Sequence, residues 1–213
     1  MKLPLIGLIA VYSFSIPAIA GVARYKRMDT AMRVFAVFCI FSFLLEIFEY
    51  VLSLKHVNNT SVSNYYVVFE WIFICLVYLL SLRNEKVKRI VSMVAVLFLC
   101  IWILDRIYFD VPGAINSEMA MTSRIFIILV SVLTIHSTVA QTERAFISEP
   151  MFWVSSGFLI YSTGVAVIVG LTNTLMKMGT SYYIAAWYIN WSLEILSNVI
   201  LTKGFFCTTK YQL

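Results

Sequence analysis

The stretch that decides the fold is Met32–Leu54, MRVFAVFCIFSFLLEIFEYVLSL. Most of its side chains are apolar, and its length matches the roughly 20 residues with which an α-helix crosses a bilayer. Two glutamates, Glu46 and Glu49, interrupt the apolar run near its end. The stretch therefore predicts a membrane-spanning helix that carries acidic groups at bilayer depth.

The rest of the chain repeats this pattern. Of its 213 residues, 61% are hydrophobic and 13% are charged, and the mean hydropathy is +0.88. A soluble domain has about 25% charged residues. The composition excludes soluble α/β enzymes, disordered chains and secreted disulfide scaffolds. We predict an all-α integral membrane protein, a bundle of seven transmembrane helices that forms a single domain over residues 1–213. The predicted spans are residues 3–23, 32–54, 65–82, 89–109, 118–140, 150–172 and 181–206.

The distribution of basic residues predicts the orientation of the bundle, because cytoplasmic loops are rich in Lys and Arg. If the N-terminus lies outside, three basic residues face the outside, namely Lys2, Lys55 and Lys177. Eleven of the 16 face the cytoplasm: Arg24, Lys26, Arg27, Arg33, Arg83, Lys86, Lys88, Arg89, Arg144, Lys203 and Lys210. We therefore expect the N-terminus outside and the C-terminus in the cytoplasm. The same bias, which follows the first span, predicts that this span is a retained helix rather than a cleaved signal peptide.

Ionisable residues inside the spans carry the functional information, because a charged side chain at bilayer depth costs at least ~2.5 kcal/mol. At 1.5 Å per residue, most of them fall in the outer half of the bundle. We expect them to line a polar cavity that opens outward. Trp187 and Trp191 share a helix face with Glu194, and aromatic faces beside acids suit an amine or another organic cation. The candidate ligand-binding residues are Glu46, Glu49, Glu70, Asp105, Arg106, Arg124, Trp187, Asn190, Trp191 and Glu194.

Structural roles are the alternative for these residues. Asp105, Arg106 and Glu70 would then be interfacial groups that reach toward water. Either Glu46 or Glu49 would pair with Arg124 or Arg106 as a brace between helices. The acids nevertheless outnumber the bases, so we expect at least one carboxyl to be protonated or to bind a cation. For the aromatic residues, the alternative to ligand binding is a place in the belt of aromatic side chains at the membrane–water interface.

The sequence gives no positive indication of a cofactor, a metal centre or nucleic-acid binding. A zinc enzyme needs three or more clustered ligands, and the two histidines, His56 and His136, are isolated. A retinal protein would need a lysine midway along the last span, where the one lysine is Lys203 near its end. Paired carboxyls doing acid–base chemistry on a lipid remain open as a third functional class.

Several segments resemble a group of small seven-helix membrane proteins of Bacteroidetes-type bacteria. The resemblance rests on YYVVFEWIFICLVYLLSLRNEKVK (Tyr65–Lys88), EPMFWVSSGFLIYSTG (Glu149–Gly164) and the closing AAWYINWSLEILSNVILTKGFF. The positions that match the group are Tyr66, Glu70, Arg124, Phe152, Trp153, Ser156, Gly157, Leu159 and Tyr161. The function of the group is uncharacterised, and the resemblance implies a sensory role beside sensor kinases.

These observations together predict a heptahelical receptor-like protein of a bacterial inner membrane, embedded in the lipid bilayer. Its outward-facing pocket would sense a small ligand or protons. A separate cytoplasmic partner such as a histidine kinase would meet the basic loops at residues 24–33 and 83–89. The alternative is a small-molecule transporter or proton-coupled cation carrier in which Glu46, Glu49 and Glu194 relay cations.

Overall fold

The structure, a computed structural model, describes residues 4–82, 84–108, 116–141 and 146–207. Within these ranges the regular secondary structure is helical and there is no strand. Seven helical segments in the described part are long and apolar enough to cross a membrane, which confirms the predicted number of spans. Of the basic residues used to predict orientation, the structure does not describe Lys2, Arg83, Arg144 and Lys210.

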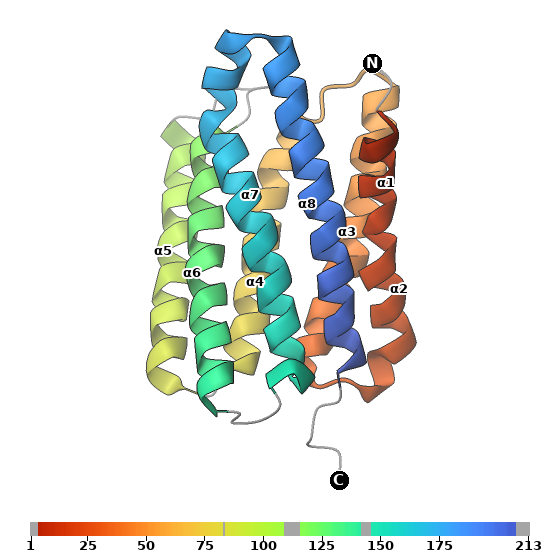
Figure 1. Cartoon of the computed structure of the whole chain (residues 1–213). Helices are drawn as coiled ribbons and strands as arrows, with labels where there is room; N and C mark the ends of the chain where they lie inside the picture. The colour runs from red at the N-terminus through yellow and green to blue at the C-terminus, as the bar shows by residue number, and fades with distance from the viewer. Residues whose placement is uncertain (1–3, 83, 109–115, 142–145, 208–213) are drawn as a thin grey trace.

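The successive spans run antiparallel to one another and form an upright bundle (Figure 1). The long helices are α3 (Thr30–Leu54), α4 (Thr60–Ser81), α5 (Glu85–Tyr108), α6 (Ser117–Gln141), α7 (Pro150–Met178) and α8 (Thr180–Phe206). The first span is built from α1 (Leu5–Ser13), α2 (Ser15–Arg24) and the 3₁₀ turn η1 (Tyr25–Arg27). A second 3₁₀ turn, η2 (Phe146–Ser148), precedes α7.

Side-chain caps explain why three helices begin earlier than the hydropathy predicts. Asn58 accepts a hydrogen bond from the backbone N–H of Thr60 (2.9 Å), at the start of α4. Asn84 accepts from Lys86 (3.0 Å) at the start of α5, and Asn116 accepts from Met119 (3.1 Å) at the start of α6. Each cap satisfies a backbone donor that the first helical turn leaves without a partner. Polar residues therefore extend each helix beyond its apolar run.

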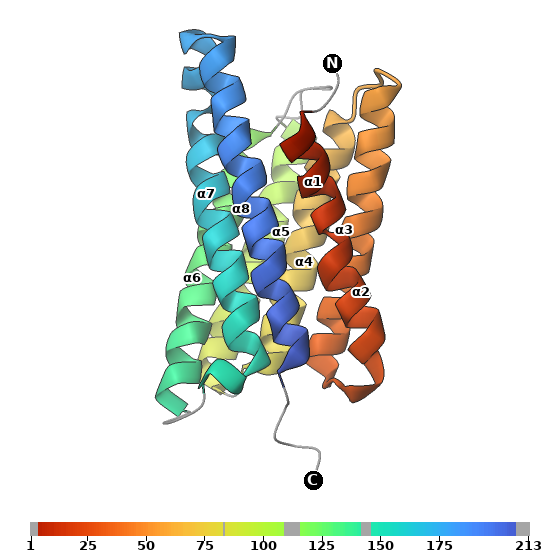
Figure 2. The ribbon, with the colours of Figure 1, turned by 45° about the vertical axis from the view of Figure 1, so that its right-hand side comes forward.

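The first span is broken between α1 and α2 at Phe14. Pro17 lies three residues later, and it has no backbone N–H to donate to the carbonyl of Ser13. Separately, the Ser13 hydroxyl donates to the Ala10 carbonyl of the preceding turn (2.6 Å). Both α1 and α2 pack against α8 and α3 (Figure 2), so the break lies inside the bundle.

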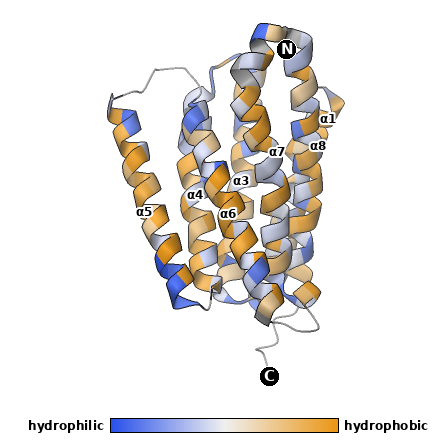
Figure 3. Ribbon diagram, turned by 60° about the vertical axis from the view of Figure 1, so that its left-hand side comes forward, coloured by the Kyte–Doolittle hydropathy of each residue, from blue (hydrophilic) through white to orange (hydrophobic). Residues whose placement is uncertain are grey.

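The tightest helix pair is α7 with α8, and α6 packs on the other side of α7. A Cβ added to Gly157 would come within 2.6 Å of the Leu201 side chain on α8. The small side chains of this span thus allow the two helices to approach closely. Helix α5 is the opposite case, because it contacts mainly α4 and is apolar over most of its length (Figure 3).

The connections α2–α3, α4–α5 and α6–α7 lie at the same end of the bundle as the end of α8 (Figure 1). We call this the basic end, because the described residues Arg24, Lys26, Arg27, Arg33, Lys86, Lys88, Arg89 and Lys203 lie on the segments that meet there. The connections α3–α4 and α7–α8 lie at the opposite end. The structure thus places the basic residues together, as the orientation argument requires.

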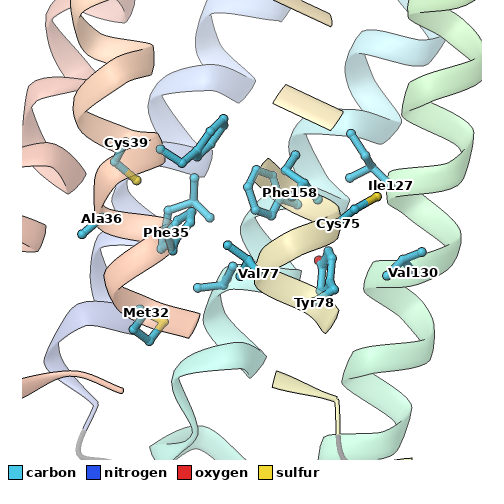
Figure 4. Packing of buried hydrophobic residues seen from close by; sticks show 14 of the residues in the cluster. Met32, Phe35, Ala36, Cys39, Cys75, Val77, Tyr78, Ile127, Val130 and Phe158 are labelled. Atoms are coloured by element: carbon cyan, nitrogen blue, oxygen red, sulfur yellow. The ribbon is translucent and has the colours of Figure 1, made fainter. Parts of the chain in front are cut away.

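Between the basic end and the middle of the bundle, four phenylalanine rings stack across three helices. We call Phe35, Phe38, Phe158 and Phe205 the aromatic block. Phe35 is fully buried and lies 5.1 Å from Phe205, 5.8 Å from Phe158 and 6.2 Å from Phe38, measured between ring centroids. Figure 4 shows Phe35 and Phe158 in the core between α3, α4 and α7. This part of the core is apolar.

The close approach of α7 and α8 predicts that bulk at Gly157 is not tolerated. Gly157→Leu is expected to lower the thermal unfolding midpoint of the purified protein by several degrees, because its side chain would displace Leu201. The matched control is Val167→Leu on the exposed face of the same helix, which is expected to leave the midpoint unchanged. Equal midpoints for the two variants would contradict the packing described here.

Candidate functional site

A small internal cavity lies halfway along the bundle. Its volume is about 30 Å³, which is room for about two water molecules. Two of its lining residues, Ser42 and Glu70, lie at the middle of α3 and of α4, so the cavity lies near the middle of the bundle. Its lining comes from the break between α1 and α2 and from α2, α3, α4, α7 and α8, and it consists of Phe14, Pro17, Phe38, Cys39, Ser42, Tyr66, Glu70, Phe158, Tyr161, Glu194, Ser197, Asn198 and Leu201.

One wall of the cavity is built on an ion pair between α4 and α6. Arg124 donates from Nη1 to Oε1 of Glu70 (2.7 Å), and its Nη2 lies 2.5 Å from Oε2. The pair is bidentate, the strongest geometry for an arginine and a carboxylate. The two side chains are 6% and 4% exposed, so neither reaches water or lipid headgroups. The ring of Tyr161 covers the guanidinium at 5.1 Å.

Glu194 on α8 lines the cavity without such a partner. It is 8% exposed, and none of the described residues hydrogen-bonds to its carboxyl group. Its charge interacts with those of Glu46, Arg124, Glu70 and Glu49. Glu194 is therefore a buried acid that faces open space.

The neutral oxygens around the cavity are held by a hydrogen-bond network. Tyr66 donates its hydroxyl to Ser42 Oγ (3.1 Å), across α4 and α3. Asn198 donates from Nδ2 to Ser13 Oγ (2.8 Å), which ties α8 to the break between α1 and α2. Ser197 donates to the Gly157 carbonyl (3.0 Å). These bonds fix side chains from α1, α3, α4 and α8 and link α8 to the backbone of α7.

The polar cluster carries more negative than positive groups. Glu46, Glu70 and Glu194 interact with one another electrostatically, and Arg124 is the cation that acts on Glu194. No described Lys or Arg forms an ion pair with Glu46 or Glu194. A buried charge costs several kcal/mol unless it is compensated. The arrangement can therefore take up a positive charge, as a proton or as a bound cation.

The structure brings together four of the ten candidate residues, Glu46, Glu70, Arg124 and Glu194. Glu49 lies one turn further along α3 and accepts a hydrogen bond from Ser63 (3.0 Å) near the end opposite the basic end. The cavity also lies deeper than expected. Because α4 begins at Thr60, Glu70 is about 15 Å from its start, which is mid-bundle rather than the outer half.

The other five candidates lie apart from the cavity. Asp105 accepts from the Asn116 side chain at the end of α5, and Arg106 stacks on Tyr65 (5.4 Å) and Trp102 (5.3 Å). The rings of Trp187 and Trp191 lie side by side on α8, with 6.1 Å between their centroids. Trp187, Trp191 and Asn190 are not among the lining residues.

The expected brace between an acid and an arginine is present, but its acid is Glu70. The sequence predicts a pair of Arg124 or Arg106 with Glu46 or Glu49, and an interfacial position for Glu70. The earlier start of α4 moves Glu70 inward to the level that the Arg124 side chain reaches. Glu70 is 3% exposed, so it is not an interfacial group.

The sequence argument also missed the contribution of the first span. Phe14 and Pro17 line the cavity, and Ser13 holds Asn198. A proline inside an apolar run indicates a kink, and this signal was present at Pro17. Nothing in the local sequence indicated that the kink faces Glu194.

In the described part of the chain, no three His, Cys, Asp or Glu side chains come together as a ligand set for a metal ion. Comparison with protein-family models, curated proteins and solved structures gives no match. The resemblance to small seven-helix proteins of Bacteroidetes-type bacteria thus stays a prediction, and the site is interpreted from its geometry alone.

The charge balance of the cluster predicts unequal effects of removing either partner of the ion pair. Arg124→Gln leaves three carboxyls without a cation and is expected to destabilise the fold by about 3–5 kcal/mol. Glu70→Gln is expected to cost less, because Glu46 and Glu194 remain near Arg124. Denaturant or thermal unfolding of the purified variants measures the difference. A larger loss for Glu70→Gln would contradict the described cluster.

Proposed function

We propose that the protein is a heptahelical sensor of a bacterial inner membrane, with its N-terminus outside and its C-terminus in the cytoplasm. Its cavity would take up a proton or another small positively charged ligand from the outer side. The observation that carries the proposal is the buried carboxyl of Glu194, which faces a cavity and has no paired cation.

In this proposal the ligand enters the cavity only from the end of the bundle opposite the basic end. On the side away from the basic end, α3 presents Glu49 and Glu46 on the same face as Ser42, so acids lead inward from that end. On the other side, Phe38, Phe158 and Leu201 of the lining continue into the aromatic block. A path that ends on packed rings suits detection of a ligand better than its passage across the membrane.

The helices that line the cavity also offer a route for the output. Below Glu194 and Asn198, α8 continues through Leu201 and Phe205 to its end at Phe206. Helix α3 runs from Ser42 through Phe35 to its start at Thr30, beside the basic turn η1. Because packed cores have discrete arrangements, a change at the cavity is expected to shift the helix ends.

A separate cytoplasmic protein would read this shift. The basic turn at Lys26 and Arg27 is exposed, as are Lys86 and Arg89 on α5. Such surfaces attract acidic partners or anionic lipid headgroups. The resemblance described above favours a sensor kinase in this role. The bias of basic residues toward one end supports the cytoplasmic placement of that end.

A proton-coupled carrier is the second candidate, and one observation favours it. Tyr78 hydrogen-bonds to Ser131 (2.8 Å) in the half of the bundle near the basic end, where Thr134 and Ser155 are also buried. A path for cations would join these hydroxyls to the cavity if the aromatic block opened. Uptake into proteoliposomes that disappears in Glu194→Gln would favour the carrier over the sensor.

The sensor proposal predicts a response at the end of α8. In Cys100→Ser, a pH-insensitive fluorophore on Cys207 is expected to change its emission when the outer side is acidified from about pH 8 to about pH 5. Cys39 and Cys75 are buried, so Cys207 takes the label. Burial raises the pKa of the Cys207 thiol, so labelling is carried out at alkaline pH.

The matched pair of variants is Glu194→Gln and Glu118→Gln, the latter at an exposed glutamate in the first turn of α6. Emission changes are expected to vanish in the first variant and to persist in the second. Constant emission in the parent, or an unchanged response in Glu194→Gln, would overturn the assignment of the cavity as the sensing site.

A further inference from the structure

We propose that the cavity binds one small monovalent cation of the size of Na⁺, with the Glu194 carboxylate as its anionic ligand and neutral oxygens of Ser42 and Asn198 beside it. This inference rests on the proposed function, since it concerns the same cavity and names the class of its ligand. Hydrogen bonding, charge and size support it.

The orientation of the Asn198 amide follows from its partner. The Ser13 hydroxyl donates its hydrogen to the Ala10 carbonyl, so Ser13 Oγ is an acceptor for Asn198. The amide nitrogen of Asn198 must therefore point to Ser13. Its carbonyl oxygen Oδ1 is left without a donor among the described residues, on a side chain that lines the cavity.

Two hydrogen-bond donors of the lining are used elsewhere. Tyr66 donates to Ser42, and Ser197 donates to the Gly157 carbonyl. The guanidinium of Arg124 is directed at Glu70. What remains open toward the cavity are the oxygens of Glu194, Asn198 and Ser42, together with the hydroxyl hydrogens of Ser42 and Tyr161, which donate to none of the described residues. The carboxylate and the amide carbonyl make the acceptors more numerous than the donors. An acceptor-rich cavity disfavours an anion and favours a cation.

The charges around Glu194 point the same way. From α3 it faces Glu46 and Glu49, from α4 Glu70, from α6 Arg124 and from α7 Tyr161. The first span contributes Phe14, at the break between α1 and α2, and Pro17 of α2 to the lining, and neither is charged. Since Arg124 is paired with Glu70, the remaining carboxyl groups of the cluster have no cation of their own among the described residues. One bound positive charge would offset Glu194.

Size and ligand number favour a monovalent ion. A volume of about 30 Å³ excludes most organic amines and is comparable with one or two waters. Ca²⁺ takes six to eight oxygens with several carboxylates, and Mg²⁺ keeps most of its own waters. In the described residues a single cavity-facing carboxylate without a partner is present, which matches a single charge.

The experiment compares the thermal unfolding midpoint of the full-length protein in NaCl, KCl and N-methyl-D-glucamine chloride at equal ionic strength and about pH 8.5. Na⁺ is expected to raise the midpoint by several degrees with a saturating concentration dependence, because a ligand that binds the folded state stabilises it. Acidification to about pH 5 is expected to reduce the shift, since a proton competes for the same carboxyl.

Variants test the ligands one at a time. Glu194→Gln is expected to remove the Na⁺ shift, and Glu118→Gln to retain it. Ser42→Ala, which keeps the carboxylate, is expected to weaken the apparent affinity about tenfold, and it serves if Glu194→Gln does not fold. Equal midpoints in all three salts, or a full Na⁺ shift in Glu194→Gln or in Ser42→Ala, would overturn the proposal.

Failure of the cation site and failure of the sensor have different signatures. If the Cys207 emission responds to acid through Glu194 but Na⁺ does not shift the midpoint, the cation site is wrong and proton sensing stands. If Na⁺ shifts the midpoint through Glu194 but the emission at Cys207 stays constant, the cation site stands and the sensor proposal is wrong.

Discussion

The ion pair between Arg124 and Glu70 is the constraint on which the interior of this bundle depends. It joins α6 to α4 at mid-depth with one charge-assisted hydrogen bond and a second close ion-pair contact. In a low-dielectric interior, each charge would cost several kcal/mol if its partner were lost. The pair commits the only guanidinium of the cluster, and it thereby leaves Glu194 exposed to the cavity without a cation. The ion pair that stabilises one wall of the cavity therefore leaves an acid without a paired cation at the opposite wall.

Much of the fold could be predicted from the sequence, because the membrane imposes long apolar runs and paired backbone groups. The span 32–54 was predicted with its C-terminal boundary intact, at Leu54. The start of α4 was missed, since Asn58 caps five residues of moderate hydropathy onto the apolar run. That small shift moved Glu70 to mid-bundle and changed the assignment of the arginine's partner.

The candidate site was predicted less completely, for a physical reason. A buried ionisable residue can be recognised in the sequence, because its cost of insertion requires an explanation. Glu46, Glu70, Arg124 and Glu194 were found in this way. Which residues meet depends on the rotation and tilt of helices far apart in the chain. Asn198 and Ser13 are separated by most of the chain, and no local sequence pattern predicts their contact.

The position of the aromatic block has an electrical consequence. If a cation reaches Glu194 from one side and stops at packed rings in mid-membrane, it has crossed about half of the transmembrane potential. A full crossing is worth about 2.3 kcal/mol per elementary charge for each 100 mV, so half is about 1.1 kcal/mol, or about sevenfold in affinity. Occupancy of the cavity would then depend on the energised state of the membrane as well as on the concentration outside.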